Sequence, residues 1–568
     1  MFDLESVLER YSERGRDALL PALWEIQTGL GYISLDNVHR LSHTLHVPAT
    51  EIYGVIEFYS LFYTEPTGDT VIQVCTNPAC GVLGADAVVG GLCDRLDIQP
   101  GETSADGRYT VLSTTCLGLC EHAPAALVNR RGVGEQAVAP AQVDDLLAGI
   151  FPPYHPVVGG DTQVLLDGVH PDRAQPLADY GDYVALRHAL IASSPEAVIE
   201  TVEQSNLIGR GGAAFPTGRK WRFTRQSPNV PRYVVCNADE SEPGTFKDRV
   251  LLEGRPHLLL EGMALCGYAV GASRGFLFIR GEYPEAARRM AKAIAEAEAA
   301  GVLGENILGT GFSFHAEIRR GGGAYICGEE TALFEAIEGK RGFPRIKPPF
   351  PTTHGLFGQP TVINNVETLC AVPGIVRHGA DWFRQWGTER SAGTKLVSVS
   401  GHIQRPGVYE IIPGITLRQL LETTCGGITG SLQTVLMGGA AGTFLTPDQL
   451  DTRLTFEDLW AIGGTFGSGA IMVFNDTVNI RDVLQRLGHF FQHESCGKCF
   501  PCQIGTQRQS EILDRLDAPL SGDSERLHDV GLTMTQASLC GLGQTAASAV
   551  LSAMQIWPEV FAGREGVG

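Results

Sequence analysis

The stretch Gly209-Arg-Gly-Gly-Ala-Ala-Phe-Pro-Thr-Gly-Arg-Lys220-Trp221 decides the fold predicted for the middle of the chain. Its four glycines let backbone N–H groups come close to a ligand, and consecutive N–H groups in such a loop form a concave anion site. Arg210, Arg219 and Lys220 add positive charge. The stretch therefore predicts a phosphate cradle, with a plain tight turn as the alternative.

A cluster of carboxylates follows the cradle in the sequence. The apolar run 233–236 predicts a buried strand, and Asp239, Glu240 and Glu242 come directly after it. Because ligands collect at the carboxyl ends of strands in open α/β sheets, we expect these side chains to border a ligand site. A phosphate cradle beside carboxylates suits a nucleotide cofactor; a solvated acidic loop is the alternative.

Size and charge exclude several classes of protein. The chain has 568 residues, enough for roughly three to five domains. Its net charge of −20 argues against nonspecific binding to nucleic acid or to anionic membranes. No apolar run reaches transmembrane length, and the N-terminus lacks a basic region before an apolar core. We therefore expect a cytoplasmic protein whose clustered cysteines ligate metal rather than form disulfides.

Two cysteine pairs follow two predicted strands near the N-terminus. The apolar runs 70–74 and 109–113 lead into Cys75 and Cys80, spaced C-x4-C, and into Cys116 and Cys120, spaced C-x3-C. Four thiolates on two loops can hold a 2Fe-2S cluster. Structural zinc is the alternative ligand.

A second group of cysteines lies in a region, from about residue 481 onward, whose pattern predicts helices. Cys496, Cys499 and Cys502 have the spacing C-x2-C-x2-C, and Cys540 follows at a distance. Three close thiolates with one remote partner are typical of a 4Fe-4S cluster.

These motifs resemble two subunits of respiratory NADH dehydrogenase. Residues 1–150 resemble its thioredoxin-like 2Fe-2S subunit, and about 370 residues after them resemble its FMN- and NADH-binding subunit, which also carries a 4Fe-4S cluster. The resemblance implies that the eight cysteines named above are cluster ligands. The family commonly has glycine where this chain has Ala214.

The resemblance also implies the residues of a flavin and nucleotide site. Phe215, Phe223 and Phe350 match aromatic side chains between which NADH stacks over the flavin. Glu242 matches the carboxylate beside the nicotinamide amide. The residues that match the cofactor-binding positions are Gly209, Arg210, Gly211, Gly212, Lys220, Asn237, Asp239, Glu240, Ser241, Tyr325, Gly328, Glu329, Glu330, Ile363, Asn364 and Asn365.

The predicted fold is a multidomain α/β protein in five segments. Residues 1–150 are expected to form a helical bundle and a thioredoxin-like domain, and 151–182, rich in proline and glycine, a linker. Residues 183–390 are expected to form a Rossmann-like FMN and NADH domain. The resemblance assigns 391–478 to a β-grasp domain and 479–568 to a helical 4Fe-4S domain.

The predicted function is that of a diaphorase. Hydride would pass between NAD(H) and FMN, which converts between two-electron and one-electron transfer, and single electrons would pass through the clusters to or from another redox subunit. Fusion of the two subunits in one chain resembles soluble NAD-reducing hydrogenases and some NAD-dependent formate dehydrogenases. A respiratory complex is the alternative, and a zinc-stabilised nucleotide-binding scaffold is the non-enzyme alternative. No nucleic acid partner and no membrane insertion are expected.

Overall fold

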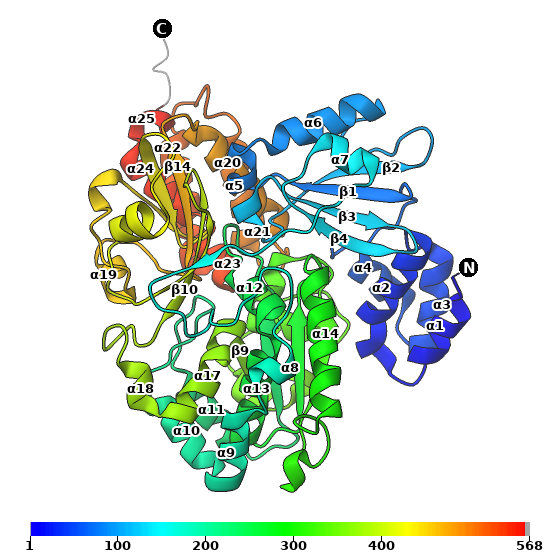
Figure 1. Cartoon of the computed structure of the whole chain (residues 1–568). Helices are drawn as coiled ribbons and strands as arrows, with labels where there is room; N and C mark the ends of the chain where they lie inside the picture. The colour runs from blue at the N-terminus through cyan, green and yellow to red at the C-terminus, as the bar shows by residue number, and fades with distance from the viewer. Residues whose placement is uncertain (1, 563–568) are drawn as a thin grey trace.

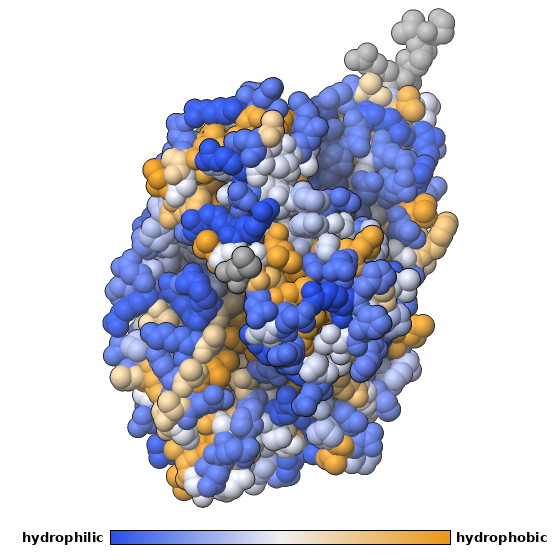
Figure 2. Space-filling model, turned by 90° about the vertical axis from the view of Figure 1, so that its right-hand side faces the viewer, coloured by the Kyte–Doolittle hydropathy of each residue, from blue (hydrophilic) through white to orange (hydrophobic). Residues whose placement is uncertain are grey.

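The computed structural model describes residues 2–562, and its elements group into four packed modules (Figure 1). No helix within this range is both long and apolar enough to cross a membrane. The face in Figure 2 is mostly hydrophilic, with apolar residues in small groups.

The N-terminal module joins a helical bundle to a mixed sheet. The amphipathic pattern of the first helix buries Val7, Leu8 and Tyr11, and Asp3 caps its N-terminus. The sheet has the order β2-β1-β3-β4, with β1 parallel to β2 and antiparallel to β3. Its elements are α1 (Leu4–Tyr11), α2 (Leu19–Leu30), α3 (Leu35–Leu45), α4 (Ala49–Ile56), β1 (Thr70–Cys75), α5 (Pro78–Val82), α6 (Ala85–Leu96), β2 (Tyr109–Thr114), β3 (Ala126–Arg130), β4 (Gly134–Val138) and α7 (Val143–Ala148).

The central module is a parallel sheet covered by helices, coloured green at the bottom of Figure 1. The strand order is β8-β7-β6-β9, and every neighbouring pair is parallel. The strands are β6 (Tyr233–Ala238), β7 (Arg274–Ile279), β8 (His315–Arg320) and β9 (Thr361–Asn365). The helices are α9 (Val184–Ala192), α10 (Pro195–Gln204), α11 (Thr217–Gln226), α12 (Lys247–Gly254), α13 (Pro256–Val270), α14 (Pro284–Ala299), α15 (Glu330–Ile337), α16 (Pro351–His354), α17 (Val366–His378) and α18 (Ala380–Arg384).

The third module is a six-stranded sheet with its own apolar core. Strands β10 (Lys395–Gly401) and β11 (Gly407–Ile411) form an antiparallel hairpin, and a wide π-type turn spans Gln419–Thr424. The sheet order is β13-β12-β14-β10-β11-β5. The module contains β10 (Lys395–Gly401), β11 (Gly407–Ile411), β12 (Leu432–Met437), β13 (Thr443–Leu445), α19 (Phe456–Ala461) and β14 (Ala470–Asn475).

The segment 151–182 is tied to this third module. It contains the short strand β5 (Val158–Gly159), which pairs with β11, and α8 (Leu177–Tyr180). The buried carboxylate of Glu410 accepts hydrogen bonds from the backbone N–H groups of residues 164–166. The predicted linker therefore has fixed backbone partners, which its composition did not indicate.

The C-terminal module is helical, as predicted. It consists of α20 (Ile480–Glu494), α21 (Phe500–Leu513), α22 (Asp523–Ala537), α23 (Gly541–Thr545), α24 (Ser548–Ile556) and α25 (Pro558–Phe561). Phe490 of α20 packs against Tyr325 of the central module, with ring centroids 5.0 Å apart. The cysteine loop between α20 and α21 is thereby held close to the carboxyl edge of the parallel sheet.

Candidate active site

Four separate segments meet at the carboxyl edge of β6 and β9. The register pairs Asn237 with Asn365 at the ends of these strands. The Asn237 Nδ2 donates to the Gly328 carbonyl at 2.8 Å, which brings in the turn 325–328. A Cβ on Gly211 would lie 3.1 Å from the Cβ of Asn365, so the glycine-rich loop also lies here. The fold thus brings together the main motifs that the sequence singled out.

The glycine-rich loop needs positive φ angles at two positions. Gly212 has φ +118° and Ala214 has φ +53°, in the region that favours glycine. Gly218 has another role, because it lies inside α11 and a Cβ there would be 2.6 Å from the backbone of Glu203. Of the four glycines in the stretch, only Gly212 has a positive φ, and Gly218 instead permits close packing of α11 on α10.

The cations of the loop point in different directions. The Lys220 Nζ donates to the Ile363 carbonyl at 3.0 Å and has no carboxylate within ion-pair distance among residues 2–562. Burial lowers the pKa of this ammonium. The Arg210 guanidinium is buried and donates to the Ala392 carbonyl at 2.5 Å. The ammonium of Lys220 is therefore available to bind an anionic ligand. The Arg210 guanidinium instead holds the glycine-rich loop against the third module.

The carboxylates after β6 are largely used by the protein itself. Glu240 accepts from the backbone N–H groups of Asp248 and Arg249, at 2.8 and 3.0 Å, and so stabilises the first turn of α12. Burial raises its pKa to about 8. Asp239 accepts from the Ser241 hydroxyl at 3.2 Å, and burial raises its pKa well above the usual range.

Glu242 connects the central module to the third module. Its Oε2 accepts from the Tyr325 hydroxyl at 2.5 Å, and its Oε1 accepts from the Ala441 N–H at 2.8 Å. Burial raises its pKa to about 7. A Cβ on Gly439, at φ +83°, would lie 2.5 Å from the Glu242 Cγ, so only glycine fits beside this carboxylate.

A second pair of predicted acids begins the next helix. Glu329 caps α15 through the N–H groups of Thr331 and Ala332. Lys347, which sequence reasoning did not single out, donates to Glu329 at 2.8 Å and to Glu330 at 2.6 Å. Its only sequence signal is its place in the stretch 341–350, which also contains Arg341 and Arg345.

The remaining predicted cofactor-binding side chains are the amides of Asn364 and Asn365 and three aromatic rings. The Asn364 Oδ1 accepts from the Trp221 indole N–H at 2.9 Å, which fixes the side chain. Phe215, Phe223 and Phe350 are 42%, 43% and 56% exposed. Exposed rings are free to stack on a planar ligand.

The four N-terminal cysteines converge where β1 and β2 end. All four thiols are buried. The Sγ atoms of Cys116 and Cys120 are 3.6 Å apart, and the thiol of Cys75 is within hydrogen-bonding reach of those of Cys80 and Cys116. This quartet on two loops fits the donor set of a 2Fe-2S cluster.

Two buried arginines fasten the second cysteine loop to the central module. The Arg280 guanidinium donates to the carbonyls of Cys116 and Glu240, at 2.5 and 2.6 Å. The Arg249 Nε donates to the Gly118 carbonyl at 2.9 Å. Sequence reasoning missed both arginines, since a lone arginine carries no motif and its partners in the cysteine loop lie more than 100 residues away.

The other four cysteines line one small pocket between α20, α21 and α23, together with Ile326, Leu539 and Leu542. Cys499 and Cys540 stand at the N-termini of α21 and α23, where helix dipoles stabilise thiolates. Among residues 2–562, no three His, Cys, Asp or Glu side chains converge on a single metal ion. The four thiols form a donor set that fits a 4Fe-4S cluster.

A buried charge network joins the flavin side to the third module. Glu367 on α17 pairs with Lys247 and Lys395, each at 2.9 Å, and accepts from the Leu396 N–H. Burial alone would raise the pKa of Glu367, but Lys247, Lys395 and Arg210 outweigh it and hold the pKa at about 2. No sequence pattern indicated this network.

Comparison with known proteins assigns each module. The profile described as the Nuo51 FMN-binding domain matches residues 202–374, and that of the thioredoxin-like [2Fe-2S] ferredoxin matches 4–150. The NADH-ubiquinone oxidoreductase-F iron-sulfur binding region matches 482–564, and the SLBB domain matches 396–438.

Two relatives align with this chain over nearly the whole of their own length. The NAD-reducing hydrogenase HoxS subunit alpha of Cupriavidus necator is 35% identical over 577 residues, covering 98% of this chain and 93% of its own. An NADH-quinone oxidoreductase subunit of Rhizobium meliloti, of the F type, is 46% identical and covers 69% of this chain and 95% of its own. The chain belongs to the complex I family of flavin iron–sulfur subunits.

A solved structure of the family has the same fold. A crystal structure of an air-oxidised NAD+-reducing [NiFe]-hydrogenase aligns with a TM-score of 0.86 at 34% identity, covering 97% of this chain and 94% of that chain. As a member of the complex I family, the protein is an oxidoreductase with an FMN domain, a 2Fe-2S domain and a 4Fe-4S domain. The sequence-based predictions of fold, family and cofactors are confirmed.

Proposed function

We propose that the chain is the NAD(H)-binding diaphorase subunit of an NAD-dependent hydrogenase or formate dehydrogenase. One observation carries the choice: the fused relative HoxS subunit alpha aligns with 98% of the chain, whereas the Rhizobium meliloti quinone oxidoreductase relative aligns with 69%. A respiratory complex is the second candidate, because identity to this second relative is higher, at 46%.

The FMN phosphate is proposed to bind at Lys220 and the N–H groups of the glycine-rich loop. The ammonium of Lys220 lacks a carboxylate partner within residues 2–562, and a phosphate would supply the missing negative charge. The exposed backbone of Gly211 and Gly212 leaves space for close approach. Bound FMN supplies the conversion between two-electron and one-electron transfer.

The nicotinamide ring is proposed to lie among Phe215, Phe223 and Phe350, with Glu242 accepting a hydrogen bond from the carboxamide. Glu242 has free lone pairs beyond the two hydrogen bonds from Tyr325 and Ala441. Because those hydrogen bonds fix the carboxylate, its contribution is orientation of the ring.

The remaining proposals concern organisation. The domain limits 1–150, 183–390, 391–478 and 479–568 are supported by the four matched profiles. The remaining segment, 151–182, is proposed as a connection that adds β5 to the third module. Other redox subunits are the proposed partners, and the cytoplasmic location stays a prediction.

Purification from the host with bound partners, followed by metal analysis, tests the assignment. Nickel with iron identifies a hydrogenase, and molybdenum or tungsten identifies a formate dehydrogenase. Iron alone, with membrane subunits attached, would replace the proposal by the respiratory complex.

A further inference from the structure

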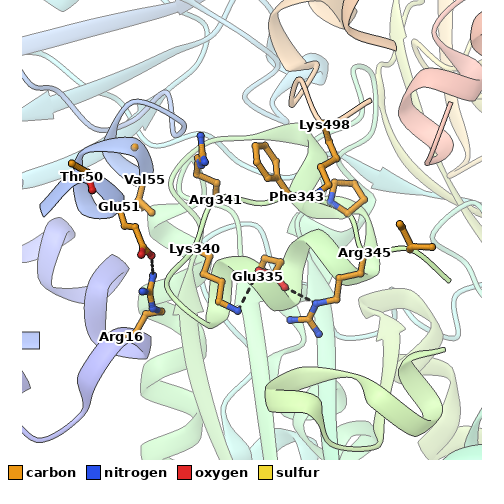
Figure 3. Close-up of a pocket in the computed structure, with 13 residues that line it drawn as sticks. Arg16, Thr50, Glu51, Val55, Glu335, Lys340, Arg341, Phe343, Arg345 and Lys498 are labelled. Carbon is orange, nitrogen blue, oxygen red and sulfur yellow. Dashed lines mark hydrogen bonds and ion pairs between the residues drawn. The ribbon is translucent and has the colours of Figure 1, made fainter. Parts of the chain in front are cut away.

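The cations around the cavity in Figure 3, which has a volume of about 730 Å³, are either paired or exposed. Arg16 pairs with Glu51 at 2.6 Å (Figure 3). Arg341 and Lys498 are exposed and lie over the Phe343 ring, at 4.8 and 5.3 Å from its centroid. Because an exposed cation keeps its hydration, no cation that lines this cavity is left without water or a carboxylate.

A second cavity, of about 350 Å³, encloses a cation that is neither paired nor exposed. It lies between the segment 164–185 and the helices α13, α17 and α18. Arg255, which precedes the first residue of α13, lines this cavity and is 8% exposed. The volume is large enough for a small organic molecule.

The Arg255 guanidinium is poorly satisfied by the protein. Its Nη1 donates a long hydrogen bond of 3.3 Å to the Leu165 carbonyl. Its buried Nε has no hydrogen-bond partner, and no carboxylate among residues 2–562 lies within ion-pair distance of the group. Burial lowers the pKa of the guanidinium. Because a buried cation without an anion is costly, this position favours an anionic ligand.

Three further features of the wall suit an oxyanion on an organic body. The helix α13 has 15 residues and no side chain that caps its N-terminus, so the positive end of its dipole lies at Arg255. Arg377, in the last turn of α17, is exposed, and its side chain makes no hydrogen bond or ion pair within residues 2–562. The buried Oε1 of Gln175 has no partner and is free to accept a hydrogen bond from a ligand hydroxyl.

The carboxylates of the wall do not neutralise Arg255. Glu261 is buried and accepts hydrogen bonds from a tyrosine hydroxyl and a backbone N–H. Asp179 pairs with Arg173 at 3.4 Å. Asp167 is exposed and keeps its hydration. Since none of the three lies within ion-pair distance of Arg255, the guanidinium remains available to a ligand.

Much of the remaining wall is apolar or aromatic, with Leu165, Val184, Leu258, Pro373, Trp382 and Phe383. A few polar groups in an apolar wall are typical of a site for a small organic molecule. We propose that this cavity, the Arg255 cavity, binds a small organic anion, with its carboxylate or phosphate group at Arg255 and its apolar body against the wall. The helix α17 connects it to the proposed flavin site, because Asn365 caps the N-terminus of this helix and residues between 370 and 378 line the cavity.

Calorimetric titration of the cofactor-loaded full chain with benzoate and with phenyl phosphate tests the proposal. The two probes share an aromatic ring and differ in the oxyanion, and benzyl alcohol is the neutral control. At least one of the anions is expected to bind saturably with a Kd of about 1 mM or lower. Tighter binding of one anion assigns the group that Arg255 recognises. No binding of either anion up to about 10 mM, or equal affinity for benzyl alcohol, would overturn the proposal.

Substitutions then locate the bound anion. Arg255→Met should raise the Kd of the tighter anion at least about tenfold, because a hydrogen-bonded charge is lost. Arg377→Glu should raise it about fivefold or more. Arg187→Glu is the matched control for Arg377→Glu, since Arg187 is an exposed arginine of α9 outside the cavity wall, and its Kd should be unchanged.

The FMN content of the variants separates the Arg255 cavity from the flavin site and should equal that of the unmodified chain. Unchanged affinity in Arg255→Met would overturn the proposal. If that variant does not fold, equal affinities in Arg377→Glu and Arg187→Glu would overturn it.

Discussion

Replacing Lys220 by methionine should weaken FMN binding without destabilising the FMN-free protein. The ammonium is held by a single carbonyl, that of Ile363 at 3.0 Å, and burial already lowers its pKa. Methionine has a similar length and no charge, so the substitution removes a partly buried cation that has no carboxylate partner. The same cation becomes favourable only when an anionic phosphate is bound.

The size of the effect follows from the kind of bond that is lost. A hydrogen bond to a charged group contributes about 1.5–3 kcal/mol. Since about 1.4 kcal/mol corresponds to a factor of ten, FMN affinity should fall about 10- to 150-fold. The melting temperature of the FMN-free chain should stay the same or rise.

The assay is titration of the deflavinated full chain with FMN, followed by quenching of flavin fluorescence. Arg219→Met is the matched control, because Arg219 lies one residue away, is exposed and carries the same charge. Its FMN affinity should change less than twofold. Equal losses in the two variants would indicate a general charge effect, and no loss in Lys220→Met would refute the phosphate assignment. A lower melting temperature of the FMN-free variant would contradict the argument from burial.

Three further substitutions test other parts of the site. Burial raises the pKa of Glu242 to about 7, so the side chain becomes a full hydrogen-bond acceptor as pH increases through 7, and kcat/KM for NADH should rise with it. A Glu242→Gln variant with the same pH profile would exclude this role. The pKa of Glu367 is held at about 2, below its usual 4.5, so its contribution of about 3 kcal/mol is present above pH 4.5 and lost as pH falls through 2. Glu367→Gln should therefore speed hydrogen exchange at the Leu396 amide at pH 7. The control variant is Glu317→Gln, which removes an ion pair outside the network. Unchanged exchange in Glu367→Gln would contradict the network. Ala214 has φ +53°, so Ala214→Gly should relieve about 1 kcal/mol of backbone strain and bind FMN at least as tightly; a weaker affinity would show that the methyl group contacts the ligand.

Much of this site could be predicted from the sequence because its chemistry is local. The spacings of the two cysteine quartets, the glycine-rich loop and the carboxylates after β6 each occupy a short stretch. A strand that ends in a parallel sheet places the residues after it at the carboxyl edge, whatever the rest of the chain does. The resemblance to a known family then assigned cofactors to these motifs.

The direction of individual side chains could not be predicted in this way. Arg210 belongs to the glycine-rich loop, yet its guanidinium is bonded to Ala392 in another module. Glu240 belongs to the acidic cluster, yet it caps α12. In both cases a buried polar group is directed to whichever partner satisfies it, and that partner is set by packing.

The sequence by itself predicted the modules, the two cysteine quartets and a phosphate cradle, because each prediction depends on short stretches of the chain. Only the tertiary structure decided how the modules are joined. Arg280 donates a hydrogen bond to the carbonyl of Cys116, 164 residues earlier in the chain, and Lys395 of the third module donates to Glu367 of the central module. It also decided that Arg341 and Lys498 meet over one ring beside the N-terminal helices. The physical reason is that burial, which sets the cost of leaving a charge unpaired, depends on packing and is not visible until the chain is folded.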